Sequence, residues 1–203
     1  LQALLSWPDS PWRPKMVRHP RSDRIVAQIP GLPNMPVGVA PKEAAILRKV
    51  QREIAAGRKV LLLCQQTATL DITPQWQDLL ARHGIRTAIL KCEPAKREEW
   101  IAQQSERGTQ VILSHPRRVQ TGLDLLEFPT ILWMSIDYSV YTVKQASRRS
   151  YRIGQTEDVA VQFYAYRGTL QEQALRLVAA KMAATDRIDG NTIATDSLTE
   201  LDN

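Results

Sequence analysis

The sequence predicts an α/β fold: a doubly wound, mainly parallel sheet of about five or six strands with helices on both faces. Two observations predict it. From residue 41 onward, short runs rich in Val, Ile and Leu alternate with amphipathic segments of helical length, which is the order of right-handed β–α–β crossovers. The first of these runs, residues 59–64 (KVLLLC), is apolar on both faces, as a strand covered by helices on each side requires.

Residues 1–40 are expected to be a linker. Eight of the twelve prolines fall in the first 41 residues, and the fixed φ and missing N–H of proline oppose a regular helix or a central strand. The opening LQALLSW looks like the end of a helix, so we expect the chain to be the C-terminal part of a longer protein. Basic residues outnumber acids in this segment: Arg13, Lys15, Arg18, Arg21 and Arg24 against Asp9 and Asp23. Two interpretations stay open, a solvated linker or a contact to a nucleic-acid backbone.

The remaining elements follow in order. Residues 41–57 form a helix that has a proline in its first turn and ends at Gly57, where a left-handed cap is favourable. The next helix, residues 73–84, has Thr73 as its cap. The other predicted strands are residues 85–90, 110–113, 130–136 and 159–166, and the other predicted helices are residues 94–108, 142–152 and 169–184. One domain therefore spans residues 41–184, and the acidic residues 185–203 are expected to form a mobile tail.

Composition excludes several classes of protein. With 43% hydrophobic and 24% charged residues among 203, the chain is of the soluble globular type, and its net charge of +6 mildly favours a polyanionic partner. Cys64 and Cys92 stand far apart with no His at ligand spacing, so we expect neither a disulfide framework nor a metal site. No apolar run approaches the ~20 residues of a membrane span, and no secretory signal is evident. We expect a cytoplasmic protein without a membrane partner.

Residues 145–155, QASRRSYRIGQ, resemble motif VI of the Swi/Snf-type DNA translocases, a branch of the superfamily 2 helicases. Residues 59–72 resemble motif IV, residues 114–125 (SHPRRVQTGLDL) resemble motif V, and residues 167–175 resemble the helix start that follows motif VI. The resemblance covers residues 41–184 and implies the second RecA-like lobe of a helicase motor, a P-loop NTPase fold. The HP that opens motif V is similar to a variant of phage-like members, so we expect a phage-like or bacterial form, nucleoid-associated if bacterial.

The resemblance implies catalytic roles in motif VI. A helix starting near Thr142 would place Arg149 and Arg152, three residues apart, on one face. By resemblance, Arg152 is the arginine finger, Arg149 is its phosphate partner and Gln145 belongs to their network. A guanidinium suits this role because it donates paired, charge-assisted hydrogen bonds to the charge that develops on a γ-phosphate. A solvated basic helix face is the alternative.

Motifs IV and V supply the other candidates. Gly122 lets the backbone approach the nucleotide, and Asp124 bonds the ribose or joins the Arg149 network, with a turn cap as the alternative. The candidates for binding a DNA phosphate are Gln65, Ser114, His115 and Arg117. Because ligands of such sheets bind at the carboxyl ends of the strands, we expect the nucleotide at that edge.

Two functions remain open. The first is a motor lobe of an ATP hydrolase that moves along DNA, duplex more than single-stranded. The sequence contains no GxxxxGK[ST] loop and no Asp followed by Glu, so ATP and Mg²⁺ would be held mainly by an upstream RecA-like lobe, and this chain alone would be inactive. The alternative is an ATPase-inactive module that binds nucleic acid or protein. Arg149 and Arg152 favour the motor, because a binding module gains nothing from a γ-phosphate sensor.

Overall fold

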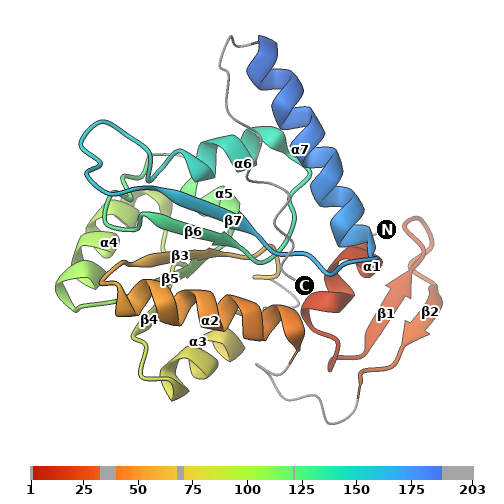
Figure 1. Cartoon of the computed structure of the whole chain (residues 1–203). Coiled ribbons are helices and arrows are strands. Elements are labelled where there is room, and N and C mark those ends of the chain that lie inside the picture. The colour runs from red at the N-terminus through yellow and green to blue at the C-terminus, as the bar shows by residue number, and fades with distance from the viewer. Residues whose placement is uncertain (1, 33–39, 68–70, 121, 189–203) are drawn as a thin grey trace.

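The computed structural model describes residues 2–32, 40–67, 71–120 and 122–188. Its centre is a sheet of five parallel strands: β3 (Val60–Leu63), β4 (Thr87–Ile89), β5 (Val111–Ser114), β6 (Thr130–Trp133) and β7 (Ala160–Phe163). They stand in the order β4-β5-β3-β6-β7 (Figure 1). The predicted α/β class with a parallel sheet is therefore confirmed.

Helices cover both faces of the sheet (Figure 1). One face carries α2 (Pro41–Ala55) and α3 (Thr73–Arg82). The other face carries α4 (Arg97–Glu106), which follows the 3-10 turn η2 (Pro94–Lys96), and then α5 (Pro116–Val119), α6 (Val140–Ser147) and α7 (Leu170–Ile188). The short helix α5 was not predicted, and α6 ends earlier than predicted. Within the described ranges, no helix is long and apolar enough to cross a membrane.

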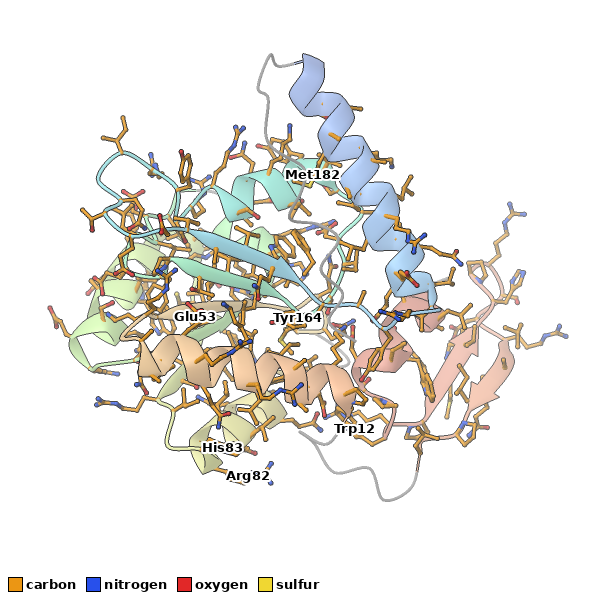
Figure 2. All side chains as sticks on the ribbon, viewed as in Figure 1. Trp12, Glu53, Arg82, His83, Tyr164 and Met182 are labelled. Atoms are coloured by element: carbon orange, nitrogen blue, oxygen red, sulfur yellow. The ribbon has the colours of Figure 1, made fainter. Side chains whose placement is uncertain are left out.

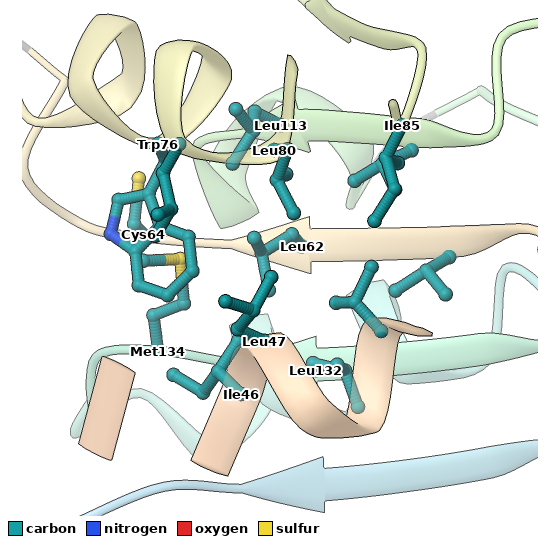
Figure 3. Packing of buried hydrophobic residues seen from close by; sticks show 14 of the residues in the cluster. Ile46, Leu47, Leu62, Cys64, Trp76, Leu80, Ile85, Leu113, Leu132 and Met134 are labelled. Carbon is teal, nitrogen blue, oxygen red and sulfur yellow. The ribbon is translucent and has the colours of Figure 1, made fainter. Parts of the chain in front are cut away.

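Strand β3 shows why the sheet is buried on both sides. Val60 and Leu62 belong to the apolar cluster beneath α2 and α3, whereas Leu61 and Leu63 belong to the cluster beneath α4 to α7, and all four are fully buried. Figure 3 shows the first cluster, in which Trp76 of α3 packs with side chains that follow β3 and β6. The apolar run of residues 59–64 therefore correctly predicted a central strand.

The N-terminal segment, which we expected to be a linker without a central strand, contains short regular elements. The chain opens with α1 (Gln2–Ser6) and the 3-10 turn η1 (Trp7–Asp9), and a two-stranded antiparallel hairpin follows, formed by β1 (Lys15–Arg18) and β2 (Ile25–Ile29). Both strands fit between prolines and pair only with each other, so proline does not interrupt a central ladder. The hairpin stands apart from the main sheet (Figure 1). The predicted tail falls almost entirely outside the described residues.

A buried ion pair holds the N-terminal segment at the carboxyl ends of the strands. Lys42 Nζ donates to Asp9 Oδ1 at 2.5 Å, and the two side chains are only 6% and 3% exposed. Three further donors reach the Asp9 carboxylate: Gln171 Nε2 at 2.9 Å, Gln66 Nε2 at 3.2 Å and Ser135 Oγ at 3.2 Å. Because a buried charge is tolerated only when it is paired and hydrogen-bonded, these contacts fix η1 to α2, to α7 and to the loops after β3 and β6.

A second network joins α2 to the amino ends of the strands. The carboxylate of Glu53 accepts hydrogen bonds from Lys49, from Arg58 and from the hydroxyl of Thr130. Burial alone would raise the pKa of this carboxyl, but the three donors outweigh it and lower the pKa to about 2. Figure 2 shows Glu53 at the end of α2 far from Trp12 and the hairpin.

The Glu53 network predicts a specific loss of stability in acid. A carboxyl whose pKa is lowered on folding stabilises the fold above its unfolded pKa of about 4.3 and loses that contribution as the pH falls toward the folded pKa. We expect the free energy of unfolding to drop by about 2 to 3 kcal/mol more in the natural chain than in Glu53→Gln between pH 4.5 and 2. Urea denaturation at a series of pH values measures this. Parallel profiles for the two proteins would contradict it, and Glu157→Gln, which changes a more exposed partner of Arg58, is the control.

Candidate functional site

Motif VI does not form one continuous helix. Helix α6 begins after Ser139, whose hydroxyl accepts the Thr142 N–H at 3.2 Å, and it ends at Ser147. The expectation that Arg149 and Arg152 share a helical face is therefore wrong, because both lie in the turns that follow. The buried Ser150 explains the early end: its Oγ donates to the carbonyl of Phe128 at 2.6 Å and draws the chain away from the helix axis.

The turns after α6 are bound to the loop that carries the end of motif V. The Leu125 N–H donates to the Arg149 carbonyl at 3.2 Å. Gln155 Nε2 donates both to the Leu126 carbonyl and to the Ser150 carbonyl, each at 2.9 Å. We call the described residues of these two segments, 120, 122–128 and 148–155, the junction. Its hydrogen bonds bring motifs V and VI together although residues 126–144 separate them in the sequence.

The two arginines of motif VI reach different partners within the junction. One guanidinium nitrogen of Arg149 donates to the Gln120 carbonyl. Arg152 forms an ion pair with Asp124, and the two side chains are 49% and 64% exposed. Asp124 thus contacts Arg152 rather than Arg149. The half-buried Gln145 lies on α6, about one turn before Arg149.

A glycine is required at Gly122 for the shape of this loop. Its φ of +68° lies in the left-handed region, which costs a residue with a side chain roughly 1–2 kcal/mol. A Cβ there would meet no atom of the described chain within 4 Å. The glycine therefore serves the backbone conformation, and the space beside it is open.

The junction is not at the edge of the sheet where we expected a nucleotide. Helix α6 starts after the carboxyl end of β6, and the segment after it leads to the amino end of β7. The loop 120–128 likewise leads to the amino end of β6, where Lys59 pairs with Glu127. The two arginines lie where the chain runs from α6 to the amino end of β7. The expectation of a nucleotide at the carboxyl edge is therefore not supported.

The candidates for DNA contact lie at the carboxyl edge, on neighbouring strands. Leu63 of β3 stands opposite Ser114 of β5, so that Gln65 and His115 follow adjacent strand ends. Ser114 is only 1% exposed, and its hydroxyl donates to the His115 carbonyl at 3.2 Å. Gln65 is half-buried and Arg117 is exposed. The structure thus brings these four together but buries one of them.

His115 has a structural role in this arrangement. Its Nδ1 accepts the Arg117 N–H at 3.1 Å and caps α5. Burial, and next the charge of Arg117, lower the pKa of His115 below its usual value, although Asp137 opposes them. An imidazole that stays neutral at neutral pH keeps the lone pair that accepts this bond.

Sequence reasoning missed Gln120 and Gln155 as members of the site. The backbone carbonyl of Gln120 holds Arg149, and no side-chain pattern indicates a backbone acceptor. Gln155 was present in the quoted motif, but its two carbonyl partners come from different segments. Its regular place in motif VI was the only signal available.

Comparisons with known proteins indicate the family of the chain. The family described as helicase conserved C-terminal domain matches residues 42–154. Among relatives, the chromatin-remodeling ATPase INO80 of Cryptococcus neoformans is 27% identical over 155 residues, 75% of this chain and 9% of the relative. Helicase swr1 of Aspergillus fumigatus is 29% identical over 162 residues, 77% of this chain and 9% of the relative. The chain thus spans less than a tenth of the length of these relatives.

A solved structure shares the fold. The crystal structure of the C-terminal part of the Fun30 ATPase domain aligns with a TM-score of 0.62 and 18% identity, over 83% of this chain and 52% of the other. The two relatives above are fungal, and they give no support to a phage-like or bacterial form. The family match covers more than half of the chain, and this chain therefore belongs to the helicase conserved C-terminal domain family.

Proposed function

We propose that the chain is the second motor lobe of an ATP-dependent DNA translocase. In this proposal Arg152 is the arginine finger and Arg149 its phosphate partner, while an upstream lobe completes the site with a phosphate loop and holds most of the ATP and the Mg²⁺. The observation that carries it is the junction, where motif V and motif VI meet, with Arg149 bound to the Gln120 carbonyl and Arg152 paired with Asp124. A bound ATP supplies the γ-phosphoryl group that is transferred to water.

A buried donor of the junction fits such a ligand. Within the described residues, Arg149 Nε is buried and has no hydrogen-bond partner. An unsatisfied buried polar atom costs about 1–3 kcal/mol. The Gln120 carbonyl thus accepts only one of the hydrogen bonds that the Arg149 guanidinium can donate. Turning this group toward an anion would therefore cost little free energy.

Arg152 is held loosely enough to change partner. An exposed ion pair contributes only about 0–1 kcal/mol, so the charge of a phosphate can replace that of Asp124. The neighbours of Arg152 also suit a surface that another part of the protein covers. Tyr151 is 74% exposed, and Ile153 is fully exposed at 104%. Two large apolar side chains beside an exposed arginine suit a surface that another lobe covers.

The DNA contacts would come from the carboxyl edge. In this proposal Gln65, His115 and Arg117 bind a backbone phosphate, and Ser114 would have to leave its bond to the His115 carbonyl to join them. Helix α5 begins directly after His115, contains Arg117 and leads to Gln120, whose carbonyl holds Arg149. We infer that this short helix couples the DNA edge to the arginines.

The test compares this chain with the longer protein that contains the upstream lobe. We expect negligible ATP hydrolysis by the chain alone, because it has no phosphate loop, and ATP hydrolysis stimulated by duplex DNA in the longer protein. A coupled assay of phosphate release measures both. A longer protein with an intact phosphate loop that hydrolyses no ATP with DNA present would contradict the motor and favour the ATPase-inactive binding module.

A further inference from the structure

The turn of the N-terminal hairpin concentrates positive charge. Residues 18–24 (RHPRSDR) contain three arginines and one histidine against one acid, and every one of these residues is exposed. Arg18 is paired with Asp23 at 2.9 Å. Within the described part of the chain, neither Arg21 nor Arg24 forms an ion pair. Two guanidinium groups therefore face solvent without a counter-charge.

The turn that carries these arginines is ordered by its own hydrogen bonds. The His19 N–H donates to the Arg24 carbonyl at 2.8 Å, and the Asp23 N–H donates to the His19 carbonyl at 3.0 Å. The His19 Nδ1 accepts the N–H of Ser22 at 3.3 Å and lies 3.4 Å from that of Arg21. The arginines thus project from a fixed frame and lose less conformational entropy on binding than those of an unstructured basic segment.

The base of the hairpin is also fixed to the lobe. The Leu32 N–H donates to the Pro11 carbonyl at 2.8 Å and closes the base. A Cβ on Gly31 would lie 2.3 Å from the carbonyl oxygen of Trp12, so only glycine fits this crossing. Arg13 reaches the Asp71 carbonyl at 3.4 Å, in the loop after β3. The base of the hairpin is therefore attached at the carboxyl edge through Arg13 and through η1, whose Asp9 accepts a hydrogen bond from Gln66, while the strands themselves extend away from the main sheet (Figure 1).

We propose that the hairpin β1–β2 is an arm that binds the phosphate backbone of duplex DNA through Arg21 and Arg24. The guanidinium fork matches the oxygens of a phosphate, and the arm stands at the same edge of the sheet as the candidates for DNA contact. The strands also expose Met16, Ile25 and Val26, which would suit a protein partner. The turn itself carries no such side chain, so its chemistry is that of a phosphate site. The proposal does not rest on the motor assignment, because the arm needs no ATP.

Binding of a short labelled duplex to this chain, followed by fluorescence anisotropy without nucleotide at several salt concentrations, tests the arm. We expect the double variant Arg21→Ala, Arg24→Ala to bind at least about tenfold more weakly near 0.1 M salt. The slope of log K against log salt should fall by about 2, because each phosphate contact contributes roughly 0.9 to it. Arg82→Ala, at the exposed end of α3 and far from the hairpin (Figure 2), is the matched control and should change neither quantity.

A variant that is expected to strengthen binding distinguishes a direct contact between the turn and DNA from an effect on the fold. Asp23 has a φ of +51°, which asparagine also tolerates, so Asp23→Asn keeps the turn while it removes the acid and its ion pair with Arg18. We expect this variant to bind the duplex several-fold more tightly. Tighter binding after a loss of negative charge is an effect that a damaged fold would not produce.

Either of two results would overturn the arm. One is that the double variant binds the duplex with the affinity and the salt slope of the natural chain. The same conclusion follows if neither protein binds the duplex. The other is an unchanged duplex affinity together with a lost affinity for polyglutamate, which would assign the turn to an acidic protein. ATP hydrolysis by the longer protein at saturating DNA should not change in the double variant. A failure of the arm is thus distinguishable from a failure of the motor assignment.

Discussion

Replacing Arg152 with alanine is expected to slow ATP hydrolysis by the longer, two-lobed protein by at least ~10³-fold, which is about 4 kcal/mol of barrier. An arginine finger stabilises charge that appears only in the transition state, so its loss should lower kcat more than it changes the affinity for ATP. Steady-state kinetics with saturating duplex DNA measure this. The fold should be retained, because the side chain is 49% exposed and its ion pair lies at the surface.

The matched control for Arg152 lies four residues earlier. Arg148 is exposed and directly follows α6, so Arg148→Ala removes the same charge from the same segment. We expect this variant to keep kcat within about twofold, since it lies outside the motif pattern. A loss of less than tenfold in Arg152→Ala, or an equal loss in both variants, would refute the assignment of the finger.

Replacing Asp9 with alanine is expected to lower the free energy of unfolding of this chain by about 3–5 kcal/mol. The change leaves the Lys42 ammonium buried with Gln171 Oε1, at 3.1 Å, as its remaining side-chain acceptor among the described residues. It also removes the acceptor of Gln66 and Ser135. Urea denaturation followed by circular dichroism measures the loss.

Two further variants decide whether the buried charge is the cause. The double variant Asp9→Ala, Lys42→Met removes both charges, so it should be more stable than Asp9→Ala alone. Asp23→Asn, which removes the acid of an exposed pair, should change stability by less than about 0.5 kcal/mol. A double variant no more stable than Asp9→Ala would show that lost packing of η1, and not an unpaired ammonium, destabilises the chain.

The core of the fold could be predicted because its signals are local. The apolar run of β3 and the amphipathic pattern of α2 and α3 each follow from side chains that the element itself carries. The N-terminal hairpin offered no such signal. Its strand β2 is exposed at four of five positions, so no alternation of buried and exposed residues marks it, and the prolines on either side favoured a linker.

For the candidate site, the motifs predicted which residues lie close together better than they predicted how those residues are arranged. The motifs identified Arg149, Arg152 and Asp124, which the structure places in one junction. The end of α6 could not be predicted, because it depends on bonds from Ser150 and Gln155 to carbonyls more than twenty residues earlier in the chain. The position of the two arginines away from the carboxyl edge could not be predicted either, because a general rule for doubly wound sheets does not specify which end of a crossover carries them.

The most direct measurement is a structure of the longer protein with duplex DNA and a non-hydrolysable ATP analogue. The distance that decides is the one between the Arg152 guanidinium nitrogens and the γ-phosphate oxygens. We expect Arg152 to have left Asp124 and to donate to a γ-phosphate oxygen at about 2.7–2.9 Å. An Arg152 that remains paired with Asp124, with no phosphate oxygen within about 4 Å, would contradict the assignment of this lobe as the source of the arginine finger.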